Sequence, residues 1–444
     1  MGRLFGTDGV RGVANKDLTP ELVFSLGKAA SLVIAQQHGS GKAKAVVGRD
    51  PRASGEMLEA ALIAGLATTG VEVLKVGVLP TPAIAYLTQY YSADLGVVLS
   101  ASHNVFSDNG VKFFSKDGKK LPDTTEDEIE KNLETIVPHP TGSEIGRVKE
   151  MADAYEAYLH HLLETIPTGS LKGLKIAVDC ANGAASESAP DLYQRAGADV
   201  IAIHNAPDGI NINDNCGSTH LESLIETVKK NKCDLGIAHD GDADRCLAID
   251  SQGNIIDGDH ILAILANDFK NSGNLNNDTV VSTVMANLGF KLAMQSSKIS
   301  VIQTAVGDRY VLEAMEENNF VLGGEQSGHV IMRNHSTTGD GLLTALQLMN
   351  AVVNSNRTLG ELAGVVTKFP QVLINVSGVD RAKIDNPILQ EEVQKIEKTL
   401  ADKGRVLLRS SGTEPLIRVM VEAETAQQAQ EIAEALAAVV KKTC

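Results

Sequence analysis

Short hydrophobic runs alternate with helix-length amphipathic segments along most of the chain, and the alternation recurs. The first round covers residues 44–104, the second covers residues 174–245, and a weaker third runs from residue 279 to residue 329. The strand-like runs, three to a round, are residues 45–47, 71–74 and 94–99, then 175–178, 199–203 and 234–238, then 279–284, 300–303 and 319–322. Strands that alternate with helix-length segments predict α/β units.

The first two rounds share a detail that indicates an internal repeat. The last run of both rounds opens with the tripeptide Asp-Leu-Gly, beginning at Asp94 and at Asp234. A tripeptide shared at the same place makes chance a poor explanation. Each third run ends in a polar loop, and ligands of α/β proteins collect at the carboxyl ends of strands. We therefore expect the three loops to face one cleft.

The pattern changes character after about residue 365. The expected elements there are strands at 369–376, 405–408 and 416–421 and helices at 384–403 and 425–442. This mixture is typical of a small α+β domain. We predict an α/β protein with three successive α/β/α domains of related topology plus a C-terminal α+β domain, arranged around one central cleft. The predicted domain ranges are 1–150, 151–252, 253–366 and 367–444.

The loop after the third run of the second round carries three carboxylates at alternate positions, Asp240, Asp242 and Asp244. Carboxylates with this spacing can converge on a hard cation such as Mg²⁺. An EF-hand also opens with alternating acidic residues, but it requires Gly at its sixth position and Glu at its twelfth, where this chain has Arg245 and Ser251. An acidic surface turn is the remaining alternative.

The equivalent loop of the first round places Ser102 directly after a strand, in the run Leu99-Ser100-Ala101-Ser102-His103-Asn104. A phosphate or hydroxyl oxygen on this serine could complete the shell of a cation held by the acidic loop. Together the two loops predict a phosphorylatable serine beside its metal, and therefore phosphoryl transfer.

A third polar segment lies between the last two strands of the C-terminal domain. Its small residues expose backbone N–H groups, its hydroxyls add donors, and two arginines add fixed positive charge. A hairpin turn alone would not need these groups. We predict a phosphate-binding nest made by Arg409, Ser410, Ser411, Gly412, Thr413 and Arg418.

Composition narrows the classes of partner. The 444 residues are 43% hydrophobic and 22% charged, which is ordinary for soluble globular domains. A net charge of -16, with no Trp and 4% aromatic residues, opposes nucleic-acid binding. The five cysteines are scattered, as is typical of buried free thiols in a reducing compartment. No apolar leader or 18-residue apolar window occurs, so we expect a cytoplasmic protein without membrane contact.

The ordered set of the Ser102 loop, the Asp240 loop, the Glu325 loop (324–329) and the Ser410 loop resembles the α-D-phosphohexomutase superfamily over essentially the whole chain. Within it, residues 5–12 and 324–329 are similar to members that interconvert glucosamine 6-phosphate and glucosamine 1-phosphate. The resemblance implies an isomerase-class phosphotransferase acting on a phosphorylated amino sugar. It also implies a phosphoserine enzyme, a sugar bisphosphate as activator and intermediate, and a cytoplasmic role in forming UDP-N-acetylglucosamine for cell-wall precursors.

The same resemblance implies roles for individual residues. Ser102 would be the phosphoserine, completing a Mg²⁺ site with the three aspartates, and Arg245 would add positive charge at the transferring phosphoryl group. Lys112 and Arg11 resemble basic residues of the active centre. His329 resembles the family's candidate proton carrier. A histidine suits this role because its pKa lies near neutrality without perturbation. Glu325 and Ser327 are expected to bind sugar hydroxyls, which need hydrogen-bonding partners.

Two departures from the family pattern carry expectations of their own. Val105 stands where proline is usual and lacks the fixed φ of proline, which predicts a less rigid serine loop. Ala243 stands where glycine is common, so we expect its φ to be negative. If the Ser410 nest holds the non-reacting phosphate, the last domain must loosen for the intermediate to turn over. A hinge near residues 364–371 is therefore predicted.

Other functions remain open at this point. A phosphoglucomutase or phosphomannomutase differs only by a few residues in the Glu325 loop. A non-catalytic sugar-phosphate sensor would not need Ser102 and all three aspartates. A metal phosphatase would release inorganic phosphate instead of isomerising the sugar. The sequence does not determine the oligomeric state, and a homodimer stays open.

Overall fold

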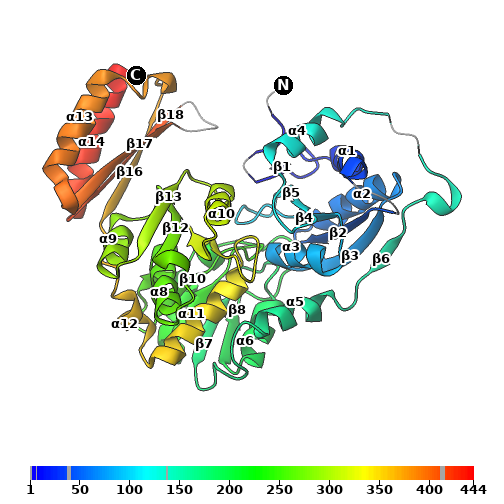
Figure 1. Cartoon of the computed structure of the whole chain (residues 1–444), viewed down its shortest axis with the longest axis horizontal. Helices are drawn as coiled ribbons and strands as arrows, with labels where there is room; N and C mark the ends of the chain where they lie inside the picture. Colours follow the sequence, from blue (N-terminus) through cyan, green and yellow to red (C-terminus); the bar gives the residue numbers. More distant parts are fainter. Residues whose placement is uncertain (1–2, 7, 38–41, 137–138, 411–415) are drawn as a thin grey trace. The chain divides into compact units, whose positions relative to one another are not determined.

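The computed structural model describes residues 3–6, 8–37, 42–136, 139–410 and 416–444. The chain divides into two compact units, shown with their elements labelled in Figure 1. Unit 1 comprises residues 1–285 and 299–365, and unit 2 comprises residues 286–298 and 366–444.

The three sheets of unit 1 share one topology. In each, a central strand is flanked by two parallel neighbours, and an antiparallel strand follows the third. The strands of the first sheet are β1 (Val10–Val13), β2 (Lys44–Arg49), β3 (Glu72–Val78), β4 (Leu95–Leu99), β5 (Asp108–Ser115) and β6 (Val148–Glu150). Those of the second are β7 (Lys175–Asp179), β8 (Asp199–Ile203), β9 (Leu235–Ala238), β10 (Leu247–Asp250) and β11 (Ile255–Ile256). Those of the third are β12 (Thr279–Thr283), β13 (Ser300–Thr304), β14 (Leu322–Gly324) and β15 (Val330–Met332).

This shared topology confirms the predicted repeat of related α/β domains. The spatial orders β3-β2-β4-β5, β8-β7-β9-β10 and β13-β12-β14-β15 match strand for strand. The third round is the least accurate, since β14 begins at Leu322 where a strand over 319–322 was expected. All five residues of β4 are buried, because helices cover both faces of a largely parallel sheet.

Helices of unit 1 connect and cover these strands. They are α1 (Pro20–Gln37), α2 (Gly55–Ala67), α3 (Thr81–Tyr90), α4 (Asp123–Lys131), α5 (Ala154–Leu163), α6 (Ser188–Arg195), α7 (Glu222–Asn231), α8 (Gly258–Asn271), α10 (Asp308–Glu317), α11 (Gly341–Ser355) and α12 (Leu359–Ala363). Helices α1 and α2 cross closely, because a Cβ at Gly65 would lie 2.2 Å from the Phe24 carbonyl oxygen.

Unit 2 is the predicted α+β domain. Its sheet is antiparallel in the order β16-β18-β17, with β16 (Gln371–Ser377), β17 (Gly404–Ser410) and β18 (Leu416–Ala423). Helices α13 (Pro387–Leu400) and α14 (Ala426–Thr443) pack on it, and α9 (Leu288–Ser296) also belongs to this unit. Figure 1 shows α13 and α14 on one side of the three strands. Val376, Ile417 and Leu436 lie in their shared core.

Cys180, Cys216, Cys233 and Cys246 are free and buried, as expected, and Cys444 is free and half-buried. Among the described helices, none combines the length and the apolar character needed to cross a membrane.

Candidate active site

Ser102 lies at the carboxyl end of β4 in the first sheet, and its side chain reaches the acidic loop that follows β9 in the second sheet. Ser102 Oγ donates a hydrogen bond to Asp240 Oδ2 at 2.6 Å. Both residues are buried. Folding thus brings together the serine and the acidic loop that the sequence analysis selected.

The acidic loop concentrates negative charge away from water. Asp240, Asp242 and Asp244 are all buried, and one carboxylate oxygen of each lies within 4.8 Å of the others. Asp242 Oδ1 and Asp244 Oδ1 have no hydrogen-bond partner among the described residues. Burial, then the charges of Asp244 and Asp242, raise the pKa of Asp240 to about 8. Unpartnered buried oxygens and surplus negative charge fit a hard cation bound by oxygen ligands.

The turn of the acidic loop corrects one expectation. Ala243 has a φ of 56°, in the left-handed region, so the expectation of a negative φ was wrong. The Ala243 N–H donates to the Asp240 carbonyl at 3.0 Å, and the Gly341 N–H donates to the Ala243 carbonyl at 3.0 Å. Hydrogen bonds at both ends of the residue therefore offset the steric cost of this conformation, which is about 1 kcal/mol for alanine.

Lys112, on β5, lies beside the acidic loop. Its Nζ is 2.9 Å from Asp242 Oδ2 and 2.9 Å from Asp8 Oδ2, and the side chain is buried. Burial alone would lower the pKa of Lys112, but the carboxylates of Asp242 and Asp8 outweigh it and raise that pKa above its ordinary value. Arg11, on β1, pairs with the same Asp8. Two fixed positive charges therefore stand near Ser102 and the acidic loop.

His329 is the last residue of the Glu325 loop and lies between two carboxylates. Its Nδ1 is 3.6 Å from Asp244 Oδ2, and its Nε2 is 3.3 Å from Asp308 Oδ2. Burial lowers the pKa of His329, but Asp244 and Asp308 reverse the effect and raise it to about 10. The expectation that the pKa of this histidine is unperturbed was therefore wrong. The sequence did not indicate the two carboxylates as its partners, because neither is adjacent to His329 along the chain. The neutral ring would instead accept from the Gly339 N–H, 3.0 Å from Nε2, so both protonation states find a partner.

The Glu325 loop is joined directly to the acidic loop. The Cys246 N–H, one residue after Arg245, donates to the Gly328 carbonyl at 3.0 Å. Glu325 and Ser327 are half-buried and retain exposed surface. Glu325 Oε1 accepts from the Gly307 N–H at 3.2 Å. This carboxylate is therefore oriented by backbone and can accept further hydrogen bonds.

Arg245 borders the acidic loop on its solvent side. Its Nε lies 3.8 Å from Asp244 Oδ1 and 4.0 Å from Asp240 Oδ2, and 26% of its side chain is exposed. A guanidinium held in this way can bind an incoming anion with its exposed N–H groups.

Models of one protein family match the chain in four stretches. They describe phosphoglucomutase/phosphomannomutase α/β/α domain I at residues 2–139, domain II at 156–253, domain III at 257–369 and the C-terminal domain at 348–439. Together these stretches cover nearly the whole sequence. The chain belongs to the phosphoglucomutase/phosphomannomutase family.

Curated relatives resemble this family member over their full length. A phosphoglucosamine mutase of Saccharopolyspora erythraea is 55% identical over 441 residues, covering 99% of this chain and 99% of that protein. A phosphoglucosamine mutase of Streptomyces griseus is 57% identical over 449 residues, again covering 99% of each. The resemblance drawn from the sequence and the enzyme class it implied are confirmed.

Solved structures share the fold at lower identity. A phosphoglucomutase/phosphomannomutase family protein of Burkholderia thailandensis has a TM-score of 0.83 at 23% identity, covering 99% of this chain and 97% of that one. An Aspergillus fumigatus N-acetylphosphoglucosamine mutase, solved with GlcNAc-6P and magnesium, has a TM-score of 0.67 at 18% identity, covering 99% and 96%. The predicted α/β class with four domains is confirmed.

The predicted phosphate nest of this family member lies in unit 2. Arg409 on β17 and Arg418 on β18 are register partners, so two like charges stand directly opposite each other. Like charges directly opposite each other repel, and a bound phosphate would offset this repulsion. Ser410 Oγ donates to the Arg381 carbonyl at 3.2 Å. Ser411, Gly412 and Thr413 fall outside the described residues.

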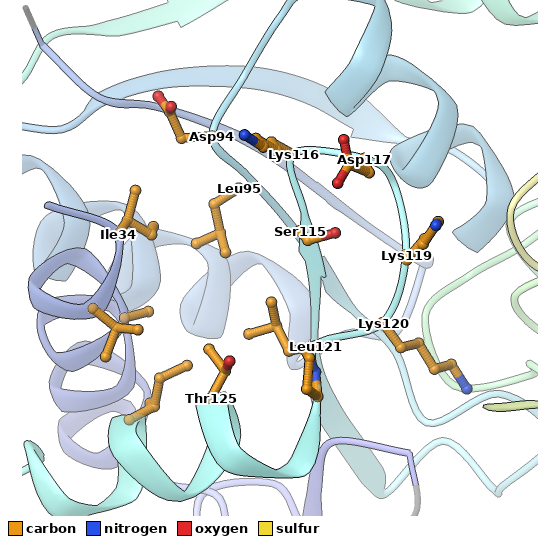
Figure 2. Close-up of a pocket in the computed structure, with 14 residues that line it drawn as sticks. Ile34, Asp94, Leu95, Ser115, Lys116, Asp117, Lys119, Lys120, Leu121 and Thr125 are labelled. Carbon is orange, nitrogen blue, oxygen red and sulfur yellow. The ribbon is translucent and has the colours of Figure 1, made fainter. Parts of the chain in front are cut away.

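Three charged residues at the site escaped the sequence analysis. Lys120 Nζ lies 2.5 Å from Asp8 Oδ1 and 2.7 Å from Asp308 Oδ2, and Asp308 in turn faces His329. Lys120 also borders a cavity of about 600 Å³, where Figure 2 shows its side chain extending away from the apolar Ile34 and Leu95. Asp8 stands in the opening motif beside Arg11, which was a usable signal. Lys120 and Asp308 had none, because only the tertiary fold joins them.

Proposed function

We propose that this protein is a phosphoglucosamine mutase. It interconverts glucosamine 6-phosphate and glucosamine 1-phosphate through a phosphoserine at residue 102 and a bisphosphorylated sugar. The relatives that are 55% and 57% identical over nearly the whole chain carry that name. The single observation that supports the chemistry is the 2.6 Å contact between Ser102 Oγ and Asp240 Oδ2 inside a buried acidic cluster.

Asp240, Asp242 and Asp244 would hold Mg²⁺, together with an oxygen on Ser102. The ion would supply positive charge to neutralise the transferring phosphoryl group. The Aspergillus fumigatus relative of this fold was solved with magnesium. The orphan oxygens of Asp242 and Asp244 support the same assignment here.

The chain's own residues divide the remaining work. In the forward transfer, the bond from phosphorus to Ser102 Oγ breaks and a bond from phosphorus to the free sugar hydroxyl oxygen forms. The sugar hydroxyl loses a proton, and Ser102 Oγ gains one. His329 is protonated at neutral pH, so it would give its proton to Ser102 Oγ and regain one from the sugar hydroxyl, which balances the step. Lys112, Arg11 and Arg245 stabilise the negative charge of the phosphoryl oxygens.

Binding of the sugar falls to the other predicted residues. Glu325 and Ser327 bind hydroxyl groups of the sugar, and Arg409, Arg418 and the Ser410 loop bind the phosphate that does not react. The bisphosphate then turns over, and its second phosphate returns to Ser102. A sugar bisphosphate therefore also serves as the activator that first phosphorylates the serine.

The predicted domains, 1–150, 151–252, 253–366 and 367–444, would carry the phosphoserine, metal, sugar and phosphate loops in that order. We place the enzyme in the cytoplasm, where the sugar phosphates of cell-wall precursor synthesis are found. A homodimer stays a prediction, and light scattering of the purified protein tests it.

A coupled isomerase assay tests the proposal. The ratio kcat/KM should be at least about tenfold higher for glucosamine 6-phosphate than for glucose or mannose 6-phosphate, because hydroxyl- and amine-specific contacts discriminate strongly. Ser102→Ala should abolish isomerisation, whereas Ser107→Ala, on an exposed residue of the same loop, should not. A preference for glucose or mannose phosphate would favour the other activities of the family. Release of inorganic phosphate without isomerisation would indicate a phosphatase, and binding without turnover would indicate a sensor.

A further inference from the structure

The backbone of Ser102 adopts a conformation that non-glycine residues rarely adopt. Its φ is 51°, in the left-handed region. The Ser102 N–H donates to Ser100 Oγ at 2.9 Å, and the Ser102 carbonyl accepts from both Arg52 Nη2 and Asn213 Nδ2 at 2.9 Å. The N–H is therefore held by a side chain of the same loop, and the carbonyl is held by two side chains from distant parts of the chain.

Arg52 closes these contacts into a ring. Ser100 Oγ donates to Asp50 Oδ2 at 2.7 Å, and Arg52 Nε donates to the same oxygen at 2.8 Å. Arg52 and Asp50 are completely buried. The ring runs from the Ser102 N–H through Ser100, Asp50 and Arg52 back to the Ser102 carbonyl. A buried network with its members hydrogen-bonded to one another fixes a single geometry.

The guanidinium of Arg52 also organises the rest of the serine loop. It donates to the carbonyl oxygens of Asn104 at 2.9 Å and Asp108 at 3.1 Å, and to that of Val105. Val105 was expected to leave this loop less rigid than proline would. Fixed donors from a buried side chain offer a different source of rigidity at this position.

Asn213 adds a hold from the second sheet. It lies in the loop between β8 and α7, and its Nδ2 donates to the carbonyls of Ser102 at 2.9 Å and Asn104 at 3.0 Å. Its own N–H donates to the Ala181 carbonyl at 2.9 Å. The residue is 6% exposed. Gly241 packs against the same place, since a Cβ there would lie 2.6 Å from the Ser102 carbonyl oxygen.

We propose that Asn213 and Arg52 form a carbonyl clamp that positions Ser102 for phosphoryl transfer. Neither residue touches the reacting atoms, so both are positioning residues. The clamp holds the serine in its left-handed conformation, and this conformation directs Oγ at Asp240. The predicted effect of the clamp on kcat rests on the proposed mutase function. Its predicted effect on the conformation of the serine loop does not.

Two substitutions of Asn213 distinguish a clamp from ordinary packing. Asn213→Asp keeps the shape but replaces the Nδ2 donor with an oxygen that faces two carbonyl oxygens. At pH 8, Asn213→Ala should lower kcat about tenfold, because the hydrogen bonds of Nδ2 to the carbonyls of Ser102 and Asn104 are both lost. Asn213→Asp should lower it about 100-fold or more, because repulsion adds to the loss. KM should change less than about threefold in both. Asn211→Ala, in the same loop and without a contact to Ser102, is the control.

Rescue by a second substitution tests the mechanism of the effect. Val105 is 59% exposed, and proline at this position would restrict the backbone of the same loop through its fixed φ. Added to Asn213→Ala, Val105→Pro should raise kcat at least about threefold. Introduced into the wild-type protein, it should change kcat by less than about twofold. Arg52→Lys, which keeps the charge but loses the forked donors, should behave like Asn213→Ala.

Hydrogen exchange supplies a readout independent of activity. Amides of residues 100–108 should exchange at least about tenfold faster in Asn213→Ala than in Asn211→Ala, with no difference in unit 2. Two results together would overturn the clamp. Exchange of residues 100–108 would be the same in Asn213→Ala as in Asn211→Ala, and the kcat of Asn213→Asp would equal or exceed that of Asn213→Ala. If the wild-type protein shows no mutase activity while exchange responds as expected, the proposed function fails and the clamp stands.

Discussion

Burying the three aspartates of the acidic loop together costs electrostatic free energy, and the raised pKa of Asp240 reflects this cost. Desolvation and two neighbouring carboxylates favour the protonated acid and raise its pKa to about 8. Before a cation binds, the folded protein therefore carries a proton on Asp240 at pH 7 that the unfolded chain does not. Between pH 4 and 8 this group contributes stability that falls as pH rises, because the unfolded state binds fewer protons.

Magnesium must displace this proton. The apparent affinity for Mg²⁺ should rise about tenfold per pH unit from pH 6 to 8 and level off above pH 8. Calorimetry of the unphosphorylated protein at pH 7, in buffers of different ionisation enthalpy, should count about one proton released for each ion bound. Asp240→Asn should bind Mg²⁺ weakly and without this pH dependence. A wild-type affinity that is flat from pH 6 to 8 would contradict the account.

His329 should serve as the proton donor. His329→Gln keeps a polar side chain of similar reach but cannot carry the proton, so kcat should fall about 10²- to 10⁴-fold with little change in KM. Steady-state kinetics with glucosamine 6-phosphate measure this effect. His160→Gln, on an exposed histidine of α5, is a matched control that should leave kcat unchanged. Wild-type kcat in His329→Gln would remove the residue from the mechanism.

The raised pKa of His329 also predicts a stability effect of known sign. Pairing with Asp244 and Asp308 stabilises the folded state fully below pH 6.5, and the contribution is lost as pH rises towards 10. Metal-free wild-type protein should therefore lose more stability than metal-free His329→Gln between pH 7 and 10 in urea unfolding. Equal losses in the two proteins would show that the carboxylates do not hold the proton.

Residue types and spacing were sufficient to select Ser102 and the three aspartates as site residues. A hydroxyl group and three carboxylates at equivalent strand ends are explained more readily by a metal and phosphate site than by the packing of the fold. The same reasoning failed for Ala243 and for the pKa of His329. In both cases the cause is a partner distant in sequence, the Gly341 N–H for the first and Asp244 together with Asp308 for the second. Local preference cannot anticipate such partners.

At the scale of elements, the Glu325 loop meets the chain just after the acidic loop at a close backbone contact. Gly328 has a φ of 93°, and a Cβ there would lie 2.4 Å from the Cys246 carbonyl oxygen. The carbonyl of Gly328 accepts the Cys246 N–H. Substitution of this glycine therefore disturbs both loops at once.

Gly328→Ala should lower the free energy of unfolding by about 2–4 kcal/mol and kcat by at least about tenfold, since backbone strain and a backbone clash combine. Gly273→Ala is the matched control. It also has a positive φ, 75°, but no heavy atom lies within 4 Å of the added Cβ. That variant should cost about 1 kcal/mol and leave kcat unchanged. Equal stability and activity of the two variants would argue against a tight junction.

Most elements were predictable because their hydrophobic periods are clear. The strand expected at 94–99 is β4, and the helix expected at 384–403 is α13, with ends shifted by a few residues. The third round was the least accurate, since β14 covers only Leu322–Gly324 and too few residues show a period. The repeat predicted that the domains have related topology, whereas the order of the strands and the antiparallel strand after each third run were not predicted.

At the scale of the whole molecule, the chain passes from unit 1 to unit 2 between Val365 and Val366, inside the segment 364–371 where a hinge is predicted. If the phosphate nest of unit 2 must release the intermediate, this segment should respond to substrate. Amides of 364–371 should exchange more slowly when glucosamine 6-phosphate is added, and those of the α1–α2 core should not change. No change in the segment at saturating substrate would argue against the hinge.

The central claim is that Ser102, beside the acidic cluster, carries the phosphoryl group through the reaction. Protein carrying an isotopically labelled phosphate on Ser102 should be mixed with excess glucosamine 6-phosphate and Mg²⁺, and the label on the serine, the sugar phosphates and inorganic phosphate followed by mass spectrometry. The account predicts that the labelled phosphoryl group passes from Ser102 to the sugar within the first turnover, that unlabelled phosphate from the substrate replaces it on Ser102, and that no labelled inorganic phosphate forms. Isomerisation that proceeds while the labelled phosphate stays on Ser102 would contradict it.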